Sequence, residues 1–509
     1  MHNWRTWTAS VLAALLLAGA AHAQEDQLQI ATVGEPPGLD AMMPFGILTQ
    51  HIGKHMFENL FTFNANWEPI PHLVSDFEVS DDGRVYTFNL REGVPFHDGS
   101  MLDSEDVVAS LERWMTVETT ASSNVEPVLV SLEATDELTV RLELSEPVAP
   151  LITMLAADGS PIYPSEIIEE YGEDPIQDYI GTGPYQFVEW LPDRHIELTR
   201  FEDYATREDE PSGFAGRREA IFETLRFIPV PDVSVRAAGV QAGQYDVALD
   251  LNPDMHAQFA NDASVDPVLI SPFGWPFFAL NKSQGLFTDK CLRQALQASL
   301  DMDVMMAGGF GDPELYDVNG SIYPPEIAAW FGEAGLEAYN QGDPERAAQM
   351  LEECDYDGSP LRILTSRQYD FLYKISLIAA QQAEEAGFNV DLQVVEWATL
   401  VERRQQPEMY DFFVTFNSMS PSPPLYQLWL FEFWPGWWAD EEKDALLAEF
   451  NEAVGHDAQF AVWERIQEMI YEEVAIIKIG DFYGLALASP DLEGLQARYT
   501  MPFWNVSRE

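Results

Sequence analysis

The chain has few basic residues. Its 509 residues include 27 lysines and arginines against 85 aspartates and glutamates, which gives a formal net charge of −58 at pH 7. Nucleic acids and anionic membranes both require a positive surface, so we expect neither as a partner. The charge says little about a small ligand, because acidic faces are commonly only solvated.

Long apolar runs are missing after the N-terminus. Residues 1–23 carry Arg5, an apolar run from Val11 to Ala21 and an A-x-A cleavage site, and so predict a cleaved signal peptide. No later run reaches the roughly 18 residues of a membrane span, and no cysteine follows the cleavage site to carry a lipid. We therefore expect a periplasmic monomer that is not embedded in a membrane.

Cysteine is scarce, with only Cys291 and Cys354. An oxidising compartment permits a disulfide between them, and the loop that it closes implies a contribution on the order of 4 kcal/mol. Two buried thiols are the equal alternative. Neither cysteine fits a CxxC redox or zinc motif.

Catalytic signatures are also absent. The sequence has no G-x-S-x-G, P-loop, G-x-G-x-x-G or H-E-x-x-H motif. Acidic pairs are too abundant to identify a glycosidase, and His51 and His55, four residues apart, have no third metal ligand nearby. We expect no enzyme, cofactor or metal, with a secreted hydrolase as a remote alternative.

What the sequence does contain is material for large α/β cores. Hydrophobic residues make up 46% and aromatic residues 12% of the chain, which argues against disorder. Residues 225–250 read as strand, helix and strand, and residues 361–395 read the same way. The length exceeds one ordinary domain, so the sequence predicts two or three α/β lobes.

Several segments resemble, in order, the family 5 extracellular solute-binding proteins, which are the peptide, dipeptide and nickel-type receptors of ABC importers. The segments span nearly the whole mature chain. They are GEPPGLD at 34–40, FENLF at 57–61, the hairpin and helix at 73–115, IGTGPY at 180–185, and a helix at 289–295 followed by SLD at 299–301.

The resemblance implies an α/β clamshell of the type II-like periplasmic binding-protein class, with two lobes joined by two crossover strands. The first lobe would comprise residues 24–55, 181–274 and 483–509, with an extra subdomain at 56–180; the second lobe would comprise residues 275–482. The function implied is capture of a small organic solute, peptide-like or otherwise carboxylate-bearing, for an ABC permease and ATPase complex. A chemosensory receptor is the alternative.

Arg367 and Tyr369 end a predicted strand in the segment TSRQY. Ligands collect beyond the carboxyl ends of strands in open α/β sheets, and a guanidinium suits a carboxylate. This R-x-Y resembles the carboxylate-binding motif of the family's dipeptide receptors. The alternative is an arginine paired with a surface acid.

The aspartate that holds the ligand's amino group in dipeptide-type relatives is missing. After the strand at 411–416 the chain reads Asn417-Ser418-Met419, and Met419 falls where the resemblance would place the acid. An ammonium without a counter-charge in a closed cleft would be costly. We therefore expect a ligand with an anionic group and a neutral or apolar body.

Aromatic residues near these segments can stack on such a body, with core packing as the alternative for each. Glu35 is a further candidate from the opposite lobe. The predicted ligand residues are Glu35, Trp275, Arg367, Tyr369, Trp397, Phe416, Asn417, Ser418, Met419, Trp437 and Trp438.

Overall fold

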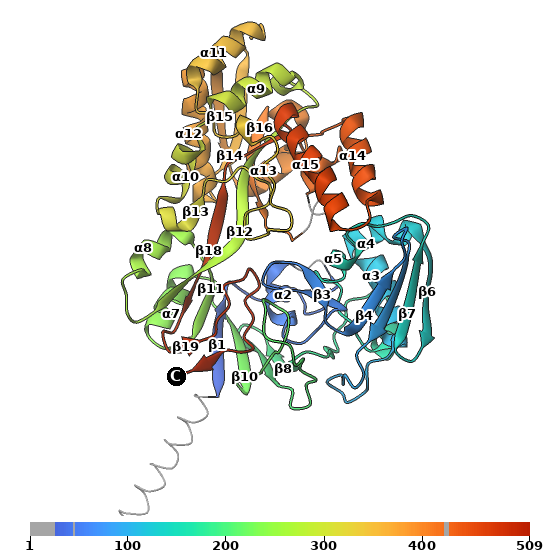
Figure 1. Cartoon of the computed structure of the whole chain (residues 1–509). Coiled ribbons are helices and arrows are strands. Elements are labelled where there is room, and N and C mark those ends of the chain that lie inside the picture. The colour runs from blue at the N-terminus through green and yellow to red at the C-terminus, as the bar shows by residue number, and fades with distance from the viewer. Residues whose placement is uncertain (1–25, 44–45, 422–426) are drawn as a thin grey trace, which may run out of the picture.

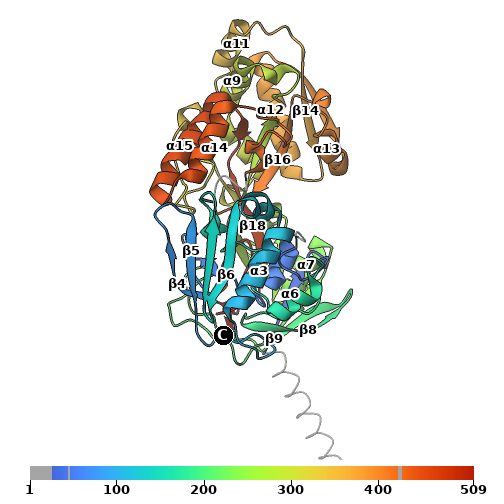
Figure 2. The ribbon, with the colours of Figure 1, turned by 90° about the vertical axis from the view of Figure 1, so that its right-hand side faces the viewer.

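The chain folds into two α/β lobes stacked one above the other (Figures 1 and 2). The structure is a computed structural model that describes residues 26–43, 46–421 and 427–509. The predicted signal peptide lies outside the described residues. The predicted two-lobed architecture is confirmed.

One long mixed sheet runs through both lobes. Its strand order is β15-β14-β16-β12-β18-β11-β1-β10-β9-β8, with β13 and β17 attached to β18 and β12. In the first lobe this sheet contains β1 (Gln27–Thr32), β8 (Tyr185–Leu191), β9 (His195–Arg200), β10 (Thr224–Pro229) and β11 (Val247–Leu251). The same lobe contains the helices α2 (Ile47–Gly53), α7 (Val233–Gln241) and α8 (His256–Phe259), among others.

Two strands carry the sheet from one lobe to the other, as predicted. They are β12 (Asp266–Leu280) and β18 (Asp481–Ala488), which pair antiparallel. The first part of β12 lies beside β18 near β11 of the first lobe, and its second part pairs with β16 of the second lobe. The domain boundaries predicted near residues 274 and 482 fall within these strands and stay predictions.

The second lobe is built around parallel strands covered by helices. Strand β14 pairs in parallel with both β15 and β16, and α12 packs on β14. Its strands are β13 (Tyr316–Asp317), β14 (Pro360–Ser366), β15 (Asn389–Val395), β16 (Phe412–Ser418) and β17 (Ile476–Lys478). Its helices are α9 (Lys290–Ser299), α10 (Met302–Phe310), α11 (Pro344–Glu353), α12 (Asp370–Ala386), α13 (Trp397–Arg403), α14 (Glu441–Glu452) and α15 (His456–Glu473).

A four-stranded antiparallel sheet forms a separate layer in the first lobe. It consists of β4 (Val74–Val79), β5 (Val85–Leu90), β7 (Thr139–Leu144) and β6 (Leu129–Asp136) in that order, with α3 (Ser104–Val117) packed on β6 and β7. Asp103 caps α3 by accepting hydrogen bonds from the amides of Glu105 and Asp106, while the Asp106 carboxylate accepts one from the Asp103 amide. This capping box fixes where the helix begins. Short elements complete the lobe: β2 (Phe61–Phe63), β3 (Pro69–Pro71), α4 (Thr119–Asn124), α5 (Leu151–Met154), α6 (Ser165–Tyr171), β19 (Leu492–Glu493) and β20 (Ser507–Arg508).

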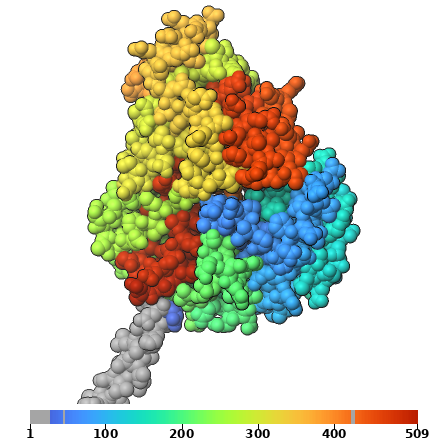
Figure 3. Space-filling model, viewed as in Figure 1, coloured from blue at the N-terminus to red at the C-terminus, as the bar shows by residue number. Residues whose placement is uncertain are grey.

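The C-terminal segment returns to the first lobe. The last residues of the chain, red in Figure 3, lie at the surface of the lower lobe beside segments from the first half of the chain. The side chains of Met501, Phe503 and Val506 are buried in its core. This segment therefore ties the end of the chain to its beginning.

The lobes touch beside the crossing strands and again on the opposite side. His256 of the first lobe lies 3.0 Å, Nδ1 to Oδ2, from Asp312 of the second. On the other side, where α14 and α15 lie above the four-stranded sheet (Figures 1 and 2), Gln459 donates to the carbonyl oxygen of Ala149 at 3.3 Å. The lobes therefore contact each other on two sides of the molecule.

The two cysteines form a disulfide in the second lobe. Cys291 lies in the first turn of α9 and Cys354 directly follows α11, with their Cα atoms 5.7 Å apart. Of the two alternatives that the sequence left open, the structure therefore has the bridge.

Candidate functional site

A cavity of about 570 Å³ lies between the lobes. Its walls come from the first lobe, including Asp250 and Asn252, from both crossing strands, and from the second lobe, including Gln368 and Phe371. We call it the interlobe cavity. Its volume is in the range of small-molecule sites, which commonly measure about 300–1,000 Å³.

A second cavity of about 500 Å³ lies in the second lobe. It shares Tyr369, Phe416 and Ser418 with the interlobe cavity, so the two adjoin. We call it the side cavity. Its remaining lining residues are Trp397, Arg404, Thr415, Asn417, Met419 and Ser420.

Aromatic rings line the junction of the two cavities. The Tyr369 ring lies edge-on to Trp397 and to Phe416, with centroids 4.8 and 5.3 Å apart. Phe371 and Phe482 continue this cluster toward the crossing strand β18. Such a surface suits an apolar or flat ligand body.

Arg404 supplies a positive charge to the side cavity. Its guanidinium carbon lies 5.8 Å from the centroid of Phe413 and 5.9 Å from that of Trp434, and burial lowers its pKa. Its Nε is buried without a hydrogen-bond partner among the described residues, and no carboxylate there pairs with it. A guanidinium stays charged at neutral pH, so the site lacks a counter-anion.

Six predicted ligand residues line these cavities. They are Tyr369, Trp397, Phe416, Asn417, Ser418 and Met419. All follow strands β14, β15 and β16 or lie at their ends, and the carboxyl ends of parallel strands meet at one edge of a sheet. No acid lines the side cavity among the described residues, and Met419 occupies the position at which dipeptide-type relatives are expected to have an aspartate.

Arg367 lies elsewhere. Its side chain is exposed, donates to the Tyr373 hydroxyl at 3.0 Å and covers the Tyr373 ring at 4.7 Å. It lines neither cavity, because the backbone beyond β14 turns Gln368 and Tyr369 inward instead. The cation that lines the side cavity is Arg404 rather than the predicted arginine.

Four other predicted residues also have structural partners outside the cavities. Glu35 accepts from Trp190 Nε1 at 3.1 Å and from the Asp193 amide at 2.8 Å. The remaining three are tryptophans: Trp275 is fully buried against Phe277 and Trp429, Trp437 stacks on Tyr410, and Trp438 is buried beneath the ammonium of Lys443. Core packing, the stated alternative, describes these rings.

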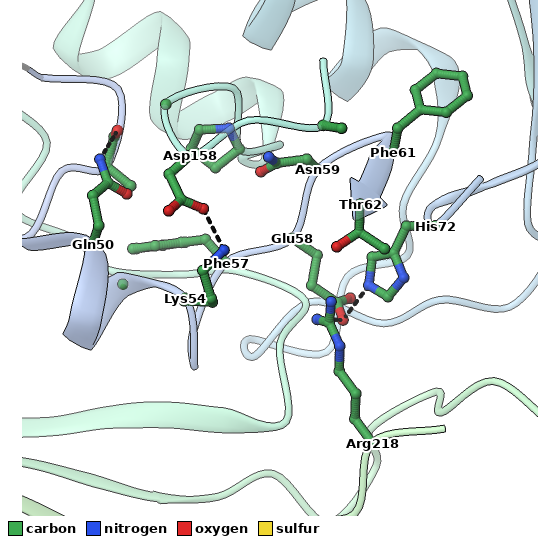
Figure 4. Close-up of a pocket in the computed structure, with 15 residues that line it drawn as sticks. Gln50, Lys54, Phe57, Glu58, Asn59, Phe61, Thr62, His72, Asp158 and Arg218 are labelled. Atoms are coloured by element: carbon green, nitrogen blue, oxygen red, sulfur yellow. Dashed lines mark hydrogen bonds and ion pairs between the residues drawn. The ribbon is translucent and has the colours of Figure 1, made fainter. Parts of the chain in front are cut away.

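The first lobe holds a separate group of buried charges (Figure 4). Glu58 accepts from Arg218 and from the Tyr204 hydroxyl and lies 2.8 Å from His72 Nε2. Burial and the nearby Arg218 lower the pKa of His72, so His72 is neutral and Arg218 carries the countercharge. The adjoining space is only about 30 Å³, which suits a water molecule and not a solute.

Among the described residues, histidines and acids also form two groups that can present three ligand atoms to a metal. They are Glu189 with His195 and Glu197, and His256 with Asp312 and Glu314. The histidine pair considered from sequence is not among them. His55 uses both ring nitrogens within the protein: Nδ1 lies 2.9 Å from the His51 carbonyl oxygen, and Nε2 accepts from the Phe503 amide.

Comparison with known proteins places this geometry in a family. Residues 68–438 match the model of the bacterial extracellular solute-binding proteins, family 5 middle. The chain belongs to this family. Of the residues that the structure describes, none form a helix both long and apolar enough to cross a membrane.

Relatives cover most of this family 5 solute-binding protein. It is 25% identical to a probable peptide ABC transporter periplasmic-binding protein of Sinorhizobium fredii, over 89% of this chain and 88% of the relative. It is 24% identical to the glutathione-binding protein GsiB of Salmonella paratyphi A, over 84% and 83%. Its fold matches the ABC transporter substrate-binding protein CtaP of Listeria monocytogenes with a TM-score of 0.82, at 21% identity, over 93% and 97%.

Arg404 and Asp250 are among the cavity residues that the sequence-based prediction missed. Arg404 directly follows the short helix α13, where Arg403 and Arg404 look alike in sequence and only the fold separates them. Asp250 is the last residue but one of β11, a strand parallel to β1, so the strand-end rule applied to Arg367 would have found it.

Proposed function

We propose that this protein is a periplasmic receptor that traps a small organic anion between its lobes and delivers it, chemically unchanged, to an ABC permease and ATPase complex. The observation that carries the proposal is Arg404, which has no carboxylate partner among the described residues and lines a cavity adjoining the interlobe cavity. The family membership indicates a solute receptor, and the chemistry of the cavity indicates the kind of ligand that it binds.

The Arg404 guanidinium favours a carboxylate or phosphate on the ligand. Arg404 is half-buried and its Nε has no hydrogen-bond partner among the described residues, so an anionic ligand group would add charge-assisted hydrogen bonds there. The rings of Tyr369, Trp397 and Phe416 lie at the same cavity and would cover an apolar body. Peptide-like compounds fit this chemistry, and the relatives above carry peptide and glutathione in their names.

Hinge closure would complete the site. The interlobe cavity draws its walls from both lobes and from both crossing strands, so rotation of one lobe against the other changes its width. A ligand that contacts both walls therefore favours the closed arrangement. In this scheme the closed form is what the permease recognises.

Substitution of Arg404 tests the proposed anion site. The probe is 4-phenylbutyrate, which joins an aromatic body to a carboxylate, and its neutral counterpart is 4-phenylbutanol. Arg404→Gln should weaken butyrate binding by about 2–4 kcal/mol in calorimetry and leave the alcohol unaffected. Arg403→Gln, the neighbouring arginine outside the cavities, is the matched control.

Arg367→Gln separates the two candidate arginines. Loss of butyrate binding in this variant, together with normal binding in Arg404→Gln, would contradict the assignment to Arg404. Mass spectrometry of the compound that co-purifies with the protein tests the non-catalytic part of the proposal. Recovery of that compound unaltered after prolonged incubation is expected, and turnover would contradict the proposal.

A further inference from the structure

Asp250 stands at an irregularity in the first-lobe wall of the interlobe cavity. The pairing of β11 with β18 shifts register between Ala248 and Leu251, and Asp250 adopts a φ of 54°. Aspartate tolerates this left-handed conformation better than most residues. The Asp250 carbonyl oxygen accepts from Arg236 Nη2 at 2.8 Å, which holds the bulge in place. Bulges of this kind redirect a side chain and occur often beside active sites.

The Asp250 carboxylate has no counter-charge in contact. Its Oδ2 is buried and has no hydrogen-bond partner among the described residues, where Asp250 also forms no ion pair. The nearby guanidinium of Arg236 directs its Nη donors to the carbonyl oxygens of Val230, Pro231 and Asp250. A buried carboxylate oxygen in this condition lowers stability until a cation reaches it.

The protein does not provide that cation from the opposite wall. Lys374 lines the same cavity, but its ammonium lies 2.6 Å from the carboxylate of Asp370, one helical turn earlier. Asp254, the next acid along the first-lobe wall, is exposed. Of the acids on this wall, Asp250 therefore has the buried carboxylate oxygen without a hydrogen-bond partner among the described residues, and its nearest guanidinium, Arg236, donates to carbonyl oxygens instead.

We propose that Asp250 binds a cationic group of the ligand, an ammonium or a guanidinium, from the first lobe. This inference rests on the proposed function and sharpens its substrate class. Arg404 faces the ligand from the second lobe and Asp250 from the first, so the preferred solute carries both charges on an apolar body. The negative charge missing near Met419 is supplied across the cleft.

This arrangement links charge recognition to closure. An anionic group alone can bind to the second lobe through Arg404 while the lobes stay apart. A cationic group at Asp250 requires the opposite wall, so an amphoteric solute joins the two lobes through its own charges. Compounds with one charge should therefore bind but hold the lobes together less firmly.

Three matched probes test the site: 4-phenylbutylamine, 4-phenylbutyrate and 4-phenylbutanol. The wild type should bind the amine about 10-fold more tightly than the alcohol, as expected for a hydrogen-bonded charge. Asp250→Asn should abolish this preference and leave butyrate binding unchanged. Arg404→Gln should weaken butyrate binding and leave the preference for the amine over the alcohol unchanged. Saturation-transfer NMR and calorimetry measure the binding of each probe to the wild type and to both variants.

Asp254→Asn is the control for a general loss of negative charge at the cavity. Asparagine tolerates the left-handed backbone as well as aspartate does, so D250N should fold, which circular dichroism checks; Asp250→Ser is the second uncharged variant. An amine preference that persists in both variants overturns the inference. An amine that binds no better than the alcohol in the wild type overturns the inference alone if butyrate binding still depends on Arg404. A wild type that binds none of the probes overturns the proposed function as well.

Discussion

His55 should make the stability of the first lobe depend strongly on pH. Its side chain is fully buried just after α2, with Nδ1 2.9 Å from the His51 carbonyl oxygen and Nε2 2.9 Å from the Phe503 amide nitrogen. The amide of Phe503 can only donate, so Nε2 must accept and the single proton lies on Nδ1. The fold therefore requires the neutral ring.

The magnitude follows from the pKa. Burial lowers the pKa of His55 from 6.5 to about 3, so between these values the unfolded chain binds a proton that the folded chain does not. The free energy of unfolding should then fall as the pH falls from 6.5 toward 3. Linkage gives a loss of about 2.5 kcal/mol from this residue between about pH 7 and about pH 4.5.

Urea unfolding followed by circular dichroism at these two pH values is the assay. The free energy of unfolding should fall by about 2.5 kcal/mol less in His55→Gln than in the wild type, because the other titrating groups are common to both. An equal pH dependence in the two proteins would refute the assignment of a neutral, buried His55 to the junction with the C-terminal segment.

The remaining predictions concern the second lobe and the cavity. Replacing Cys291 and Cys354 with serine should lower the free energy of unfolding by about 4 kcal/mol in denaturant titrations, because the bridge closes a loop across a sequence separation of 63; unchanged stability would contradict a formed bridge. Binding of 4-phenylbutyrate should alter tryptophan emission in the wild type but not in Trp397→Phe, because Trp397 lines the side cavity; a response retained by the variant would place the reporting ring elsewhere.

Local patterns in the sequence were enough to predict the frame of the second lobe. The apolar strand at Arg362–Thr365, the helix ended by Gly387 and the following strand appear as β14, α12 and β15. Each depends on contacts close in sequence, such as the left-handed glycine that closes α12. Tyr369 and Trp397, which follow β14 and β15, were predicted correctly as cavity residues because the ends of these strands were predicted correctly.

The positions of the other predicted ligand residues depend on contacts with residues far away in the sequence, which local sequence patterns do not show. Glu35 is held by residues of the β8–β9 hairpin more than 150 positions away, with a separation of 155 to Trp190. Arg367 and Arg404 are both strand-end or helix-end arginines near the same sheet edge. Which of them meets the cavity is decided by Tyr373, whose ring and hydroxyl hold Arg367 outside.

The gap in the β12–β18 ladder gives the clamshell a natural pivot. Pairing stops at Ile270, opposite Gly484, and resumes at Gly274, opposite Phe482. Three residues on one strand therefore face one on the other, and this stretch can twist without losing regular cross-strand bonds. Phe273 lies in that stretch and lines the interlobe cavity. A solute in that cavity would contact the pivot itself, so we expect the angle between the lobes to change with occupancy.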